Sequence, residues 1–255
     1  MSDAKGKFIW YDLMTSDTAA AEAFYKSVVG WGAQDAGTPG TSYTLFTLGN
    51  DPVCGLMVPP EDAKPGFRLG WRGYVAVENV DAVAAQVVQA GGNIRLAAAD
   101  IPGVGRFAVV DDPQGARFVL FRGIGEPPPA PAPNTPGRVG WHELAAAEGA
   151  TAFDFYAALF GWTKAEAFDM GPMGLYQLFT TGGAPVGGMM TKPETVPTPF
   201  WLYYINVEAI DAAADRVTAA GGKILLGPCE VPGGSWILNA LDPQGLSFAL
   251  VAPRR

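Results

Sequence analysis

The spacing of apolar and polar side chains changes repeatedly along the chain, which indicates alternating strands and helices. Residues 8–14 alternate and are rich in aromatic side chains, as in a half-buried strand. Residues 19–29 place apolar side chains at helical spacing, with Ser16 or Asp17 as a candidate N-cap and Gly30 as a helix stop. The same reasoning predicts strands at 43–48, 53–58, 73–77, 106–110 and 117–121, a turn at 49–52, and a helix at 81–90. The first half of the chain therefore contains two rough βαβββ modules.

The second half of the chain repeats the first. Phe8–Trp31, FIWYDLMTSDTAAAEAFYKSVVGW, matches Val139–Trp162, VGWHELAAAEGATAFDFYAALFGW, at both tryptophans and at the Phe-Tyr pair of the helix. Further on, YTLFTLGNDPVCGLM matches YQLFTTGGAPVGGMM, and the turn Asp-Pro-Gln-Gly at 112–115 returns at 242–245. Because the matches keep their order, we interpret the chain as a duplication that holds four modules.

A proline-rich segment separates the two copies. Six of the twelve residues of Glu126–Gly137, EPPPAPAPNTPG, are proline. Such a segment favours polyproline II and acts as a semi-rigid spacer, and a proline-motif ligand for another protein is the alternative. We therefore predict domains at 1–125 and 138–255, joined by a linker at 126–137.

The ordered set of motifs resembles a known superfamily. A first strand, a helix ending Phe-Tyr…Gly-Trp, a strand and helix closing on Ala-Gly-Gly, and a final Asp-Pro-Gln-Gly turn all occur twice. This set is similar to the vicinal oxygen chelate superfamily of glyoxalases, bleomycin- and fosfomycin-resistance proteins and extradiol dioxygenases. More narrowly, it resembles two-domain, glyoxalase-like bacterial antigens that are often labelled hydroxylases. The resemblance implies an α+β fold of tandem domains, in each of which two βαβββ modules form a curved sheet around a small-molecule cup, usually with a divalent metal at its base.

The resemblance also implies where metal ligands would stand, and these positions carry other residues. They fall at Trp10, Arg72 and Val119 in the first copy and at Trp141, Leu202 and Ala249 in the second, none of which is a usual ligand. The single histidine, His142, cannot supply a two-histidine iron site, and strand alternation turns it toward the helix layer as a packed side chain. We predict no metal and no other cofactor, with a divalent-metal lyase or isomerase of the glyoxalase type as the alternative.

Two acids recur at matched positions on the predicted inner face of the cups. Asp12 and Glu143 follow Trp10 and Trp141 by two residues on equivalent strands. A carboxylate beside a tryptophan in a dry cavity has a raised pKa and can act as a general acid or base. We predict Asp12 and Glu143 as catalytic residues; the alternative is that both are hydrogen-bonded or ion-paired structural groups.

The same alternation places further side chains in the cups. The predicted ligand-binding residues are Trp10, Arg72, Tyr74 and Arg117 in the first copy, and Trp141, Tyr204, Asn206 and Trp236 in the second. Because the two arginines have no basic counterparts in the second copy, the first cup would suit a carboxylate or phosphate and the second a neutral, more aromatic ligand. Arg106 and Trp236 are candidates for the cup rims. Tyr43 and Tyr176 could line either a pocket or the core.

Charge and composition narrow the set of partners. Lys and Arg number 17 against 25 Asp and Glu, and the resulting net charge of −8 repels nucleic acid and anionic lipid surfaces. We recognise no targeting or membrane-spanning segment, and Cys54 and Cys229 fall at non-equivalent positions, which favours reduced thiols. We expect a cytoplasmic monomer or homodimer that binds a small molecule, either as an acid/base enzyme or as a non-catalytic, sequestering resistance protein.

Overall fold

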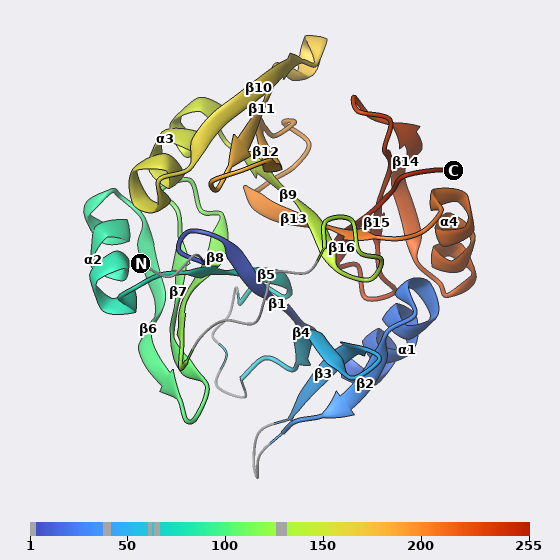
Figure 1. Ribbon diagram of the computed structural model, residues 1–255, viewed down its shortest axis with the longest axis horizontal. Helices are drawn as coiled ribbons and strands as arrows, with labels where there is room; N and C mark the ends of the chain where they lie inside the picture. Colours follow the sequence, from blue (N-terminus) through green and yellow to red (C-terminus); the bar gives the residue numbers. More distant parts are fainter. Residues whose placement is uncertain (1–3, 38–41, 61–62, 64–66, 126–131) are drawn as a thin grey trace. The chain divides into compact units, whose positions relative to one another are not determined.

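The computed structural model describes residues 4–37, 42–60, 63, 67–125 and 132–255, so part of the predicted linker, 126–131, lies outside the described residues (Figure 1). The first copy consists of β1 (Phe8–Met14), α1 (Thr18–Val29), β2 (Gly32–Asp35), β3 (Tyr43–Leu48), β4 (Asp51–Met57), β5 (Gly70–Ala76), α2 (Val80–Gln89), β6 (Asn93–Ile101), β7 (Gly105–Asp111) and β8 (Arg117–Gly123). The order is β-α-β-β-β twice, as the sequence pattern predicts.

The second copy repeats this order. It consists of β9 (Val139–Ala146), α3 (Gly149–Phe160), β10 (Thr163–Asp169), the short 3-10 helix η1 (Gly171–Met173), β11 (Leu175–Thr180), β12 (Pro185–Thr191), β13 (Phe200–Asn206), α4 (Ile210–Ala219), β14 (Lys223–Glu230), β15 (Trp236–Leu241) and β16 (Ser247–Ala252). None of the helices in the described part of the chain has the length and apolar character needed to cross a membrane.

Two strands of the first copy were not predicted, and several predicted boundaries differ from the structure; for example, β5 begins at Gly70 rather than at 73. The strands β2 and β6 were not predicted, and both stand at the edge of a sheet, where one long side has no partner strand. Their side chains are largely exposed, which removes the apolar alternation that would reveal them. The predicted turn at 49–52 is also too long, because β4 begins at Asp51.

Each copy forms one eight-stranded sheet, and the two sheets share one topology. The strand orders are β2-β3-β4-β1-β5-β8-β7-β6 and β10-β11-β12-β9-β13-β16-β15-β14. The register is repeated as well, since Asp12 pairs with Gly55 across the parallel β1–β4 ladder and Glu143 pairs with Gly188 across β9–β12. The two acids therefore occupy the same place in their sheets.

Contacts group the chain into two compact units, and each unit combines halves of both copies. Unit 1 contains residues 1–10, 73–130 and 141–201, whereas unit 2 contains 11–72, 131–140 and 202–255. The strands β1, β5, β9 and β13 each pass from one unit to the other. Each unit thus joins the first module of one copy to the second module of the other.

In unit 1, the repeated motifs of the two copies bind each other. Helix α2 packs on β6, β7 and β8, α3 packs on β11 and β12, and the two helices touch (Figure 1). The fully buried Tyr156 of α3 donates to the Asp112 carboxylate of the β7–β8 hairpin at 3.0 Å. Glu148 makes no side-chain cap at the start of α3, and the Gln114 amide bonds its backbone N–H and C=O at 2.8 and 2.9 Å instead. The β7–β8 hairpin of the first copy therefore supplies the hydrogen bonds at the N-terminus of helix α3 of the second copy.

Unit 2 repeats this arrangement with the copies exchanged. Helix α1 touches α4, and the Asp17 side chain caps α1 by accepting from Ala20 N–H at 2.9 Å. Gln244, from the β15–β16 hairpin of the second copy, bonds the backbone of Asp17 of the first copy at 3.0 and 2.8 Å. The Tyr25 hydroxyl lies 3.4 Å from the Asp242 carboxylate. The Phe-Tyr and Asp-Pro-Gln-Gly motifs are thus partners in the tertiary structure.

Candidate functional site

The first predicted acid forms a hydrogen-bonded pair with a tyrosine. Asp12 of β1 accepts a hydrogen bond from the Tyr43 hydroxyl at 2.8 Å, and it is 3% exposed. Tyr43 reaches it across the intervening strand β4, where Gly55 stands directly beside Asp12. A Cβ atom at Gly55 would overlap both the Tyr43 hydroxyl and the Asp12 carboxylate. The glycine therefore makes room for the pair.

The second acid forms the same pair at the same register. The Tyr176 hydroxyl donates to Glu143 Oε2 at 3.0 Å and accepts from the Trp141 indole N–H at 2.8 Å. The Tyr176 ring lies over Gly188, where a Cβ atom would overlap it. Unlike the buried Asp12, Glu143 is half-buried, as are Trp141 and Tyr176. This acid can be reached from solvent.

Burial and charge keep the groups around these acids protonated. Burial raises the pKa of the Tyr176 hydroxyl well above its usual value, and the negative charge of Glu143 raises it further. Burial likewise raises the pKa of the Cys54 thiol, with a further contribution from Asp12. Tyr176 is therefore a proton donor that fixes the orientation of the carboxylate, and Cys54 lacks the thiolate character of a nucleophile.

Sequence analysis recognised the two tyrosines only as pocket or core residues and did not single out the two glycines. The signal was present in the aligned copies, because Tyr43 and Tyr176 recur together with Gly55 and Gly188. A comparison of the two copies does not show that each tyrosine passes over a glycine of the neighbouring strand and bonds an acid on the strand beyond it. That relation depends on the pairing of three strands.

The other predicted residues of unit 1 are held mostly by structural contacts. The Arg117 guanidinium bonds Asp111 at 2.7 Å, and Arg95 bonds the same carboxylate at 2.6 Å. Although burial alone would raise it, these two arginines hold the pKa of Asp111 below its usual value. Tyr74 meets Phe121 edge-on at 5.9 Å between ring centroids. Trp10 is half-buried in β1.

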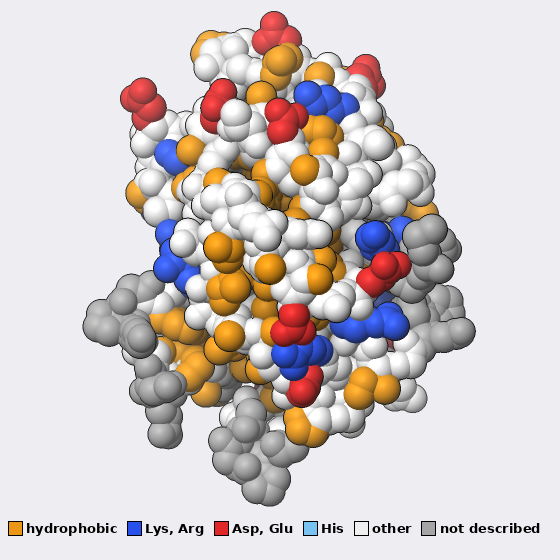
Figure 2. Space-filling model, turned by 90° about the vertical axis from the view of Figure 1, so that its left-hand side faces the viewer, with side chains coloured by type: hydrophobic (Ala, Val, Ile, Leu, Met, Phe, Trp, Pro, Cys, Tyr) orange, Lys and Arg blue, Asp and Glu red, His pale blue; other side chains and the backbone are white. Residues whose placement is uncertain are grey.

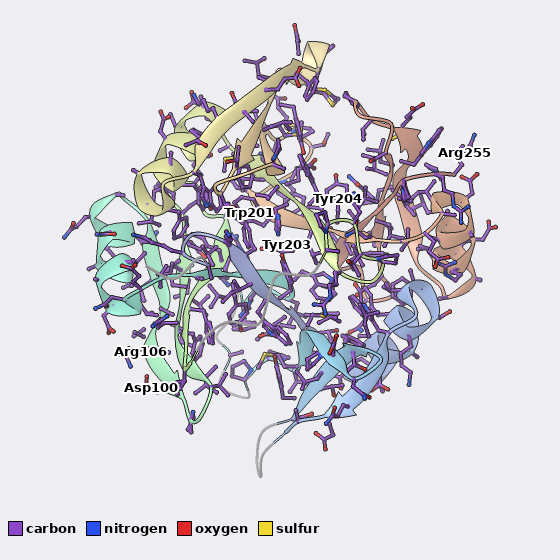
Figure 3. All side chains as sticks on the ribbon, viewed as in Figure 1. Asp100, Arg106, Trp201, Tyr203, Tyr204 and Arg255 are labelled. Atoms are coloured by element: carbon purple, nitrogen blue, oxygen red, sulfur yellow. The ribbon has the colours of Figure 1, made fainter. Side chains whose placement is uncertain are left out.

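In unit 2, the predicted residues also have structural neighbours. Arg72 is buried, donates to the Arg68 carbonyl at 2.8 Å and lies 5.0 Å from the ring centroid of Phe67. The Asn206 amide donates to the Arg138 carbonyl at 3.0 Å. Tyr204 of β13 is buried, with 2% of its surface exposed. The Arg255 guanidinium lies 4.8 Å from the ring centroid of Trp236 (Figure 3).

Arg106, a predicted rim residue, belongs to unit 1 and is bound by two acids. Its guanidinium bonds Asp81 of α2 at 2.7 Å and Asp100 of β6 at 2.9 Å (Figure 3). Basic and acidic side chains are interspersed over the face drawn in Figure 2.

Of the predicted site residues, the structure brings Trp141 and Glu143 together, because both are hydrogen-bonded to the Tyr176 hydroxyl. Asp12 lies in the other unit.

The single histidine is packed, as the strand alternation predicts. His142 is 7% exposed, and its ring stacks on Phe8 with 4.2 Å between centroids. Its Nδ1 lies 2.7 Å from the Val186 carbonyl, so this nitrogen carries the proton. Burial lowers the pKa of His142 to about 4. The ring is therefore neutral near pH 7.

The residues at the expected metal positions do not fit a divalent cation. Trp10, Val119 and Arg72, and in the second copy Trp141, Leu202 and Ala249, offer indole, aliphatic and cationic groups rather than carboxylate, imidazole or thiolate donors. Among the residues that the structure describes, no three His, Cys, Asp or Glu side chains cluster as a metal site would require. No chemical step is therefore assigned to a metal.

Asn239 on β15 has a feature that sequence analysis missed. Its side-chain oxygen is buried and has no hydrogen-bond partner among the described residues. The register places Asn239 beside Ala249, and Ala249 beside Tyr204. In the first copy the matching row is Val109, Val119 and Tyr74. The exchange of valine for asparagine between the copies was the signal that pointed to this position.

We expect Asn239→Val to raise the free energy of unfolding by about 1 kcal/mol, because it removes an unsatisfied buried acceptor and restores the residue of the first copy. Urea denaturation measures this change. The matched control is Asn206→Val, which removes an amide that is bonded to Arg138 and should destabilise the protein. A loss of stability in Asn239→Val would show that its oxygen is satisfied.

A shallow hollow of about 370 Å³ in unit 1 lies away from the acids. It is lined by Ala90, Pro113, Gln114, Thr151, Ala152 and Phe155, at the junction of the hairpin and α3. None of these side chains is ionisable. The hollow thus belongs to the docking of hairpin and helix, and the chemical groups lie on the Glu143 face.

Comparisons with known proteins agree with this fold. A family model described as Glyoxalase/Bleomycin resistance protein/Dioxygenase superfamily matches residues 7–120 and 138–250. The protein named "Putative glyoxylase CFP32" from Mycobacterium bovis is 34% identical over 249 residues, which cover 96% of this chain and 94% of that protein. The "Anthracycline biosynthesis protein DnrV" of Streptomyces peucetius is 32% identical over 266 residues, covering 98% and 94%.

Solved structures resemble the chain at low sequence identity. The Mn(II)-bound glyoxalase from Novosphingobium aromaticivorans has a TM-score of 0.63 at 18% identity, covering 96% of this chain and 81% of that one. The 2,2',3-trihydroxybiphenyl 1,2-dioxygenase of Sphingomonas wittichii strain RW1 has a TM-score of 0.67 at 14% identity, covering 96% and 89%. At these identities the likeness shows the fold alone, and it confirms the tandem α+β architecture.

Proposed function

The chain belongs to the Glyoxalase/Bleomycin resistance protein/Dioxygenase superfamily, and from this premise we propose that it binds a small aromatic molecule and acts on it with a carboxylate rather than a metal. One observation carries the proposal. The acid–tyrosine pair occurs in both copies at one register, supported each time by a glycine. At the positions where the superfamily would hold a metal, this chain has no carboxylate, imidazole or thiolate side chain.

We assign the chemical role to Glu143. It is half-buried and accepts a hydrogen bond from Tyr176, which orients the carboxylate without neutralising it. A bound molecule with an acidic C–H or O–H group would transfer its proton to Glu143, and Tyr176 would retain its hydrogen bond to the carboxyl group as the charge changes. Asp12 is 3% exposed, so we assign it a structural role within unit 2.

The aromatic character of the proposed ligand has two supports. Trp141 and Tyr176 present half-buried rings beside Glu143, and such rings bind flat apolar molecules. A relative that matches nearly the whole chain carries the name "Anthracycline biosynthesis protein DnrV".

We expect Glu143→Gln to lower turnover by about 100-fold or more while the affinity changes only a few-fold, because the amide keeps the shape of the carboxylate but cannot accept a proton. A panel of polycyclic phenols and quinones, titrated by tryptophan fluorescence and followed by mass spectrometry, measures both quantities. Glu166→Gln, which removes an exposed charge from the same sheet, is the control.

Two outcomes would contradict this proposal. If the wild-type protein binds a compound tightly and leaves it unchanged, the protein sequesters its ligand and is not an enzyme. If protein purified without chelator holds one divalent ion per chain, and removal of that ion abolishes turnover, the chemistry belongs to a metal. Elemental analysis gives the second answer directly.

A further inference from the structure

A small cavity in unit 2 is lined by charged and polar side chains that the proposed function does not use. It has a volume of about 190 Å³ and lies where the end of α1 meets the start of α4, two helices that contact each other (Figure 1). The polar side chains that line it are Asn206 at the end of β13, Glu208 just before α4, and Arg216 of α4. We call it the Arg216 cavity.

Arg216 brings a positive charge to this cavity. Its side chain is half-buried, and its Nε–H donates to the Val28 carbonyl at 2.8 Å. Among the described residues, its two terminal NH2 groups have no hydrogen-bond partner and no carboxylate forms an ion pair with it. A guanidinium that is partly removed from water is stabilised by an anion, and its fork of N–H groups matches a carboxylate. The packing of the helix does not require this charge, because the matching place on α2 holds Gln86.

Asn206 brings an almost buried hydrogen-bond acceptor. Only 6% of its surface is exposed, and its amide NH2 donates to the Arg138 carbonyl at 3.0 Å. Its Oδ1 accepts no hydrogen bond from any residue that the structure describes. The matching place in the first copy holds Ala76, which has no polar side chain. A donor group within the cavity would satisfy the Asn206 oxygen.

Glu208 adds a negative charge to the same cavity. Its backbone carbonyl accepts a hydrogen bond from the Arg254 side chain at 3.2 Å, whereas its exposed carboxylate has no ion-pair partner in the described part of the chain. A simple anion would therefore be attracted by Arg216 and repelled by Glu208, and a simple cation would experience the reverse. A molecule that carries both charges can place each one near its opposite.

The volume of the cavity limits the ligand to a few heavy atoms. Since a water molecule takes about 30 Å³ in the liquid, about 190 Å³ holds roughly six waters. Pockets for drug-sized ligands are larger, about 300–1,000 Å³. Val29 and Pro136 supply apolar wall to the cavity, which suits a short aliphatic frame between the two charges.

We propose that the Arg216 cavity binds a small amino acid as its zwitterion, with the carboxylate on the Arg216 guanidinium and the ammonium toward the Glu208 carboxylate and the Asn206 Oδ1. The cavity belongs to unit 2, whereas Glu143 belongs to unit 1. The inference therefore does not rest on the proposed function, and it gives the chain a second ligand of a different chemical class.

Three matched probes test the proposal on the full-length protein. They are L-alanine, propionate, which lacks the ammonium, and ethylamine, which lacks the carboxylate. Binding is measured by saturation-transfer NMR and by calorimetric titration at low salt. We expect alanine to bind about tenfold more tightly than either of the other probes, because each of them loses one of the two charge contacts. Added salt should reduce this preference, since Glu208 is exposed.

Two variants assign the charges to their residues. Arg216→Gln introduces the residue of the first copy and should weaken alanine binding about tenfold, while ethylamine binding stays within about twofold. Glu208→Gln should weaken alanine binding toward the level of propionate and should strengthen propionate binding, because it removes a repulsive charge. Circular dichroism of each variant confirms folding.

The first copy offers matched controls. Glu78 occupies the place of Glu208 in unit 1, so Glu78→Gln removes the same charge from an equivalent exposed position. Arg122 is likewise exposed in unit 1, and Arg122→Gln removes one positive charge. Neither change should alter the binding of alanine, since both leave the Arg216 cavity as it is.

Three outcomes would overturn the proposal. Equal binding of alanine and propionate to the wild-type protein would show that the ammonium is not recognised. Unchanged alanine binding in Arg216→Gln would place the amino acid elsewhere. Absence of saturable alanine binding to the wild-type protein would remove the site altogether. None of these results bears on turnover at Glu143, so the two proposals fail independently.

Discussion

Tyr156→Phe should lower the free energy of unfolding by about 3 kcal/mol, although it removes only one oxygen atom. The Tyr156 hydroxyl is fully buried, donates to Asp112 at 3.0 Å and accepts from the Trp201 indole N–H at 3.0 Å. Asp112 and Trp201 are 1% and 5% exposed, so water cannot readily replace the lost partner. Two buried polar groups, one of them a carboxyl, would be left with fewer hydrogen bonds.

The first copy supplies the matched control for this prediction. Tyr25 occupies the same place in unit 2, accepts from Trp71 at 3.0 Å and lies 3.4 Å from Asp242. Because that last contact is longer, and because Trp71 is only half-buried, Tyr25→Phe should cost less than Tyr156→Phe. Urea denaturation of both variants measures the difference. A loss below about 0.5 kcal/mol in Tyr156→Phe would contradict the role assigned to its hydroxyl.

The stability of the protein should fall by about 3 kcal/mol between pH 7 and pH 4 because of His142 alone. Burial lowers the pKa of this histidine from 6.5 to about 4 in the folded chain. In the unfolded chain the ring has its ordinary pKa and takes up a proton as the pH falls below 6.5. Between these two values the unfolded state binds more protons than the folded state, so acid favours unfolding.

His142→Gln isolates this contribution. Glutamine does not titrate, and its amide can still donate to the Val186 carbonyl that Nδ1 contacts at 2.7 Å. The variant loses the stacking on Phe8, so its stability at pH 7 should be lower. Its stability should nevertheless decline less steeply with acid than that of the wild-type protein, as urea denaturation at several pH values would show. Parallel declines would mean that His142 is protonated in the folded chain.

Much of the fold was evident from local patterns. The element order of both copies and a helix within one residue of 81–90 follow from periodicity, which acts over a few residues. Capping chemistry narrowed the start of the first helix to Ser16 or Asp17, and the structure has Asp17 as the N-cap. The edge strands β2 and β6 were missed because exposed strands need no apolar alternation. The burial of His142 could be predicted because strand alternation alone sets the side of the sheet on which its ring lies.

The candidate site was only half visible in the sequence. The repeat located Asp12 and Glu143, but not the tyrosines that bond them, because each tyrosine acts across a strand that lies between. Nor could composition distinguish the buried Asp12 from the half-buried Glu143, whose separate roles we propose on that difference. Burial depends on which side chains pack nearby, and a pattern along one strand does not contain that information.

The duplication, the order of its elements and the places of its two acids were determined by the sequence itself, since matched residues and local periodicity do not depend on distant contacts. Only the tertiary structure decided how the repeated motifs combine. The hairpin at 112–115 holds the helix α3 of the second copy, and the hairpin at 242–245 holds α1 of the first. The copies are so similar that pairing within a copy and pairing between copies satisfy the same sequence pattern. The choice between them is made by long-range packing and hydrogen bonding.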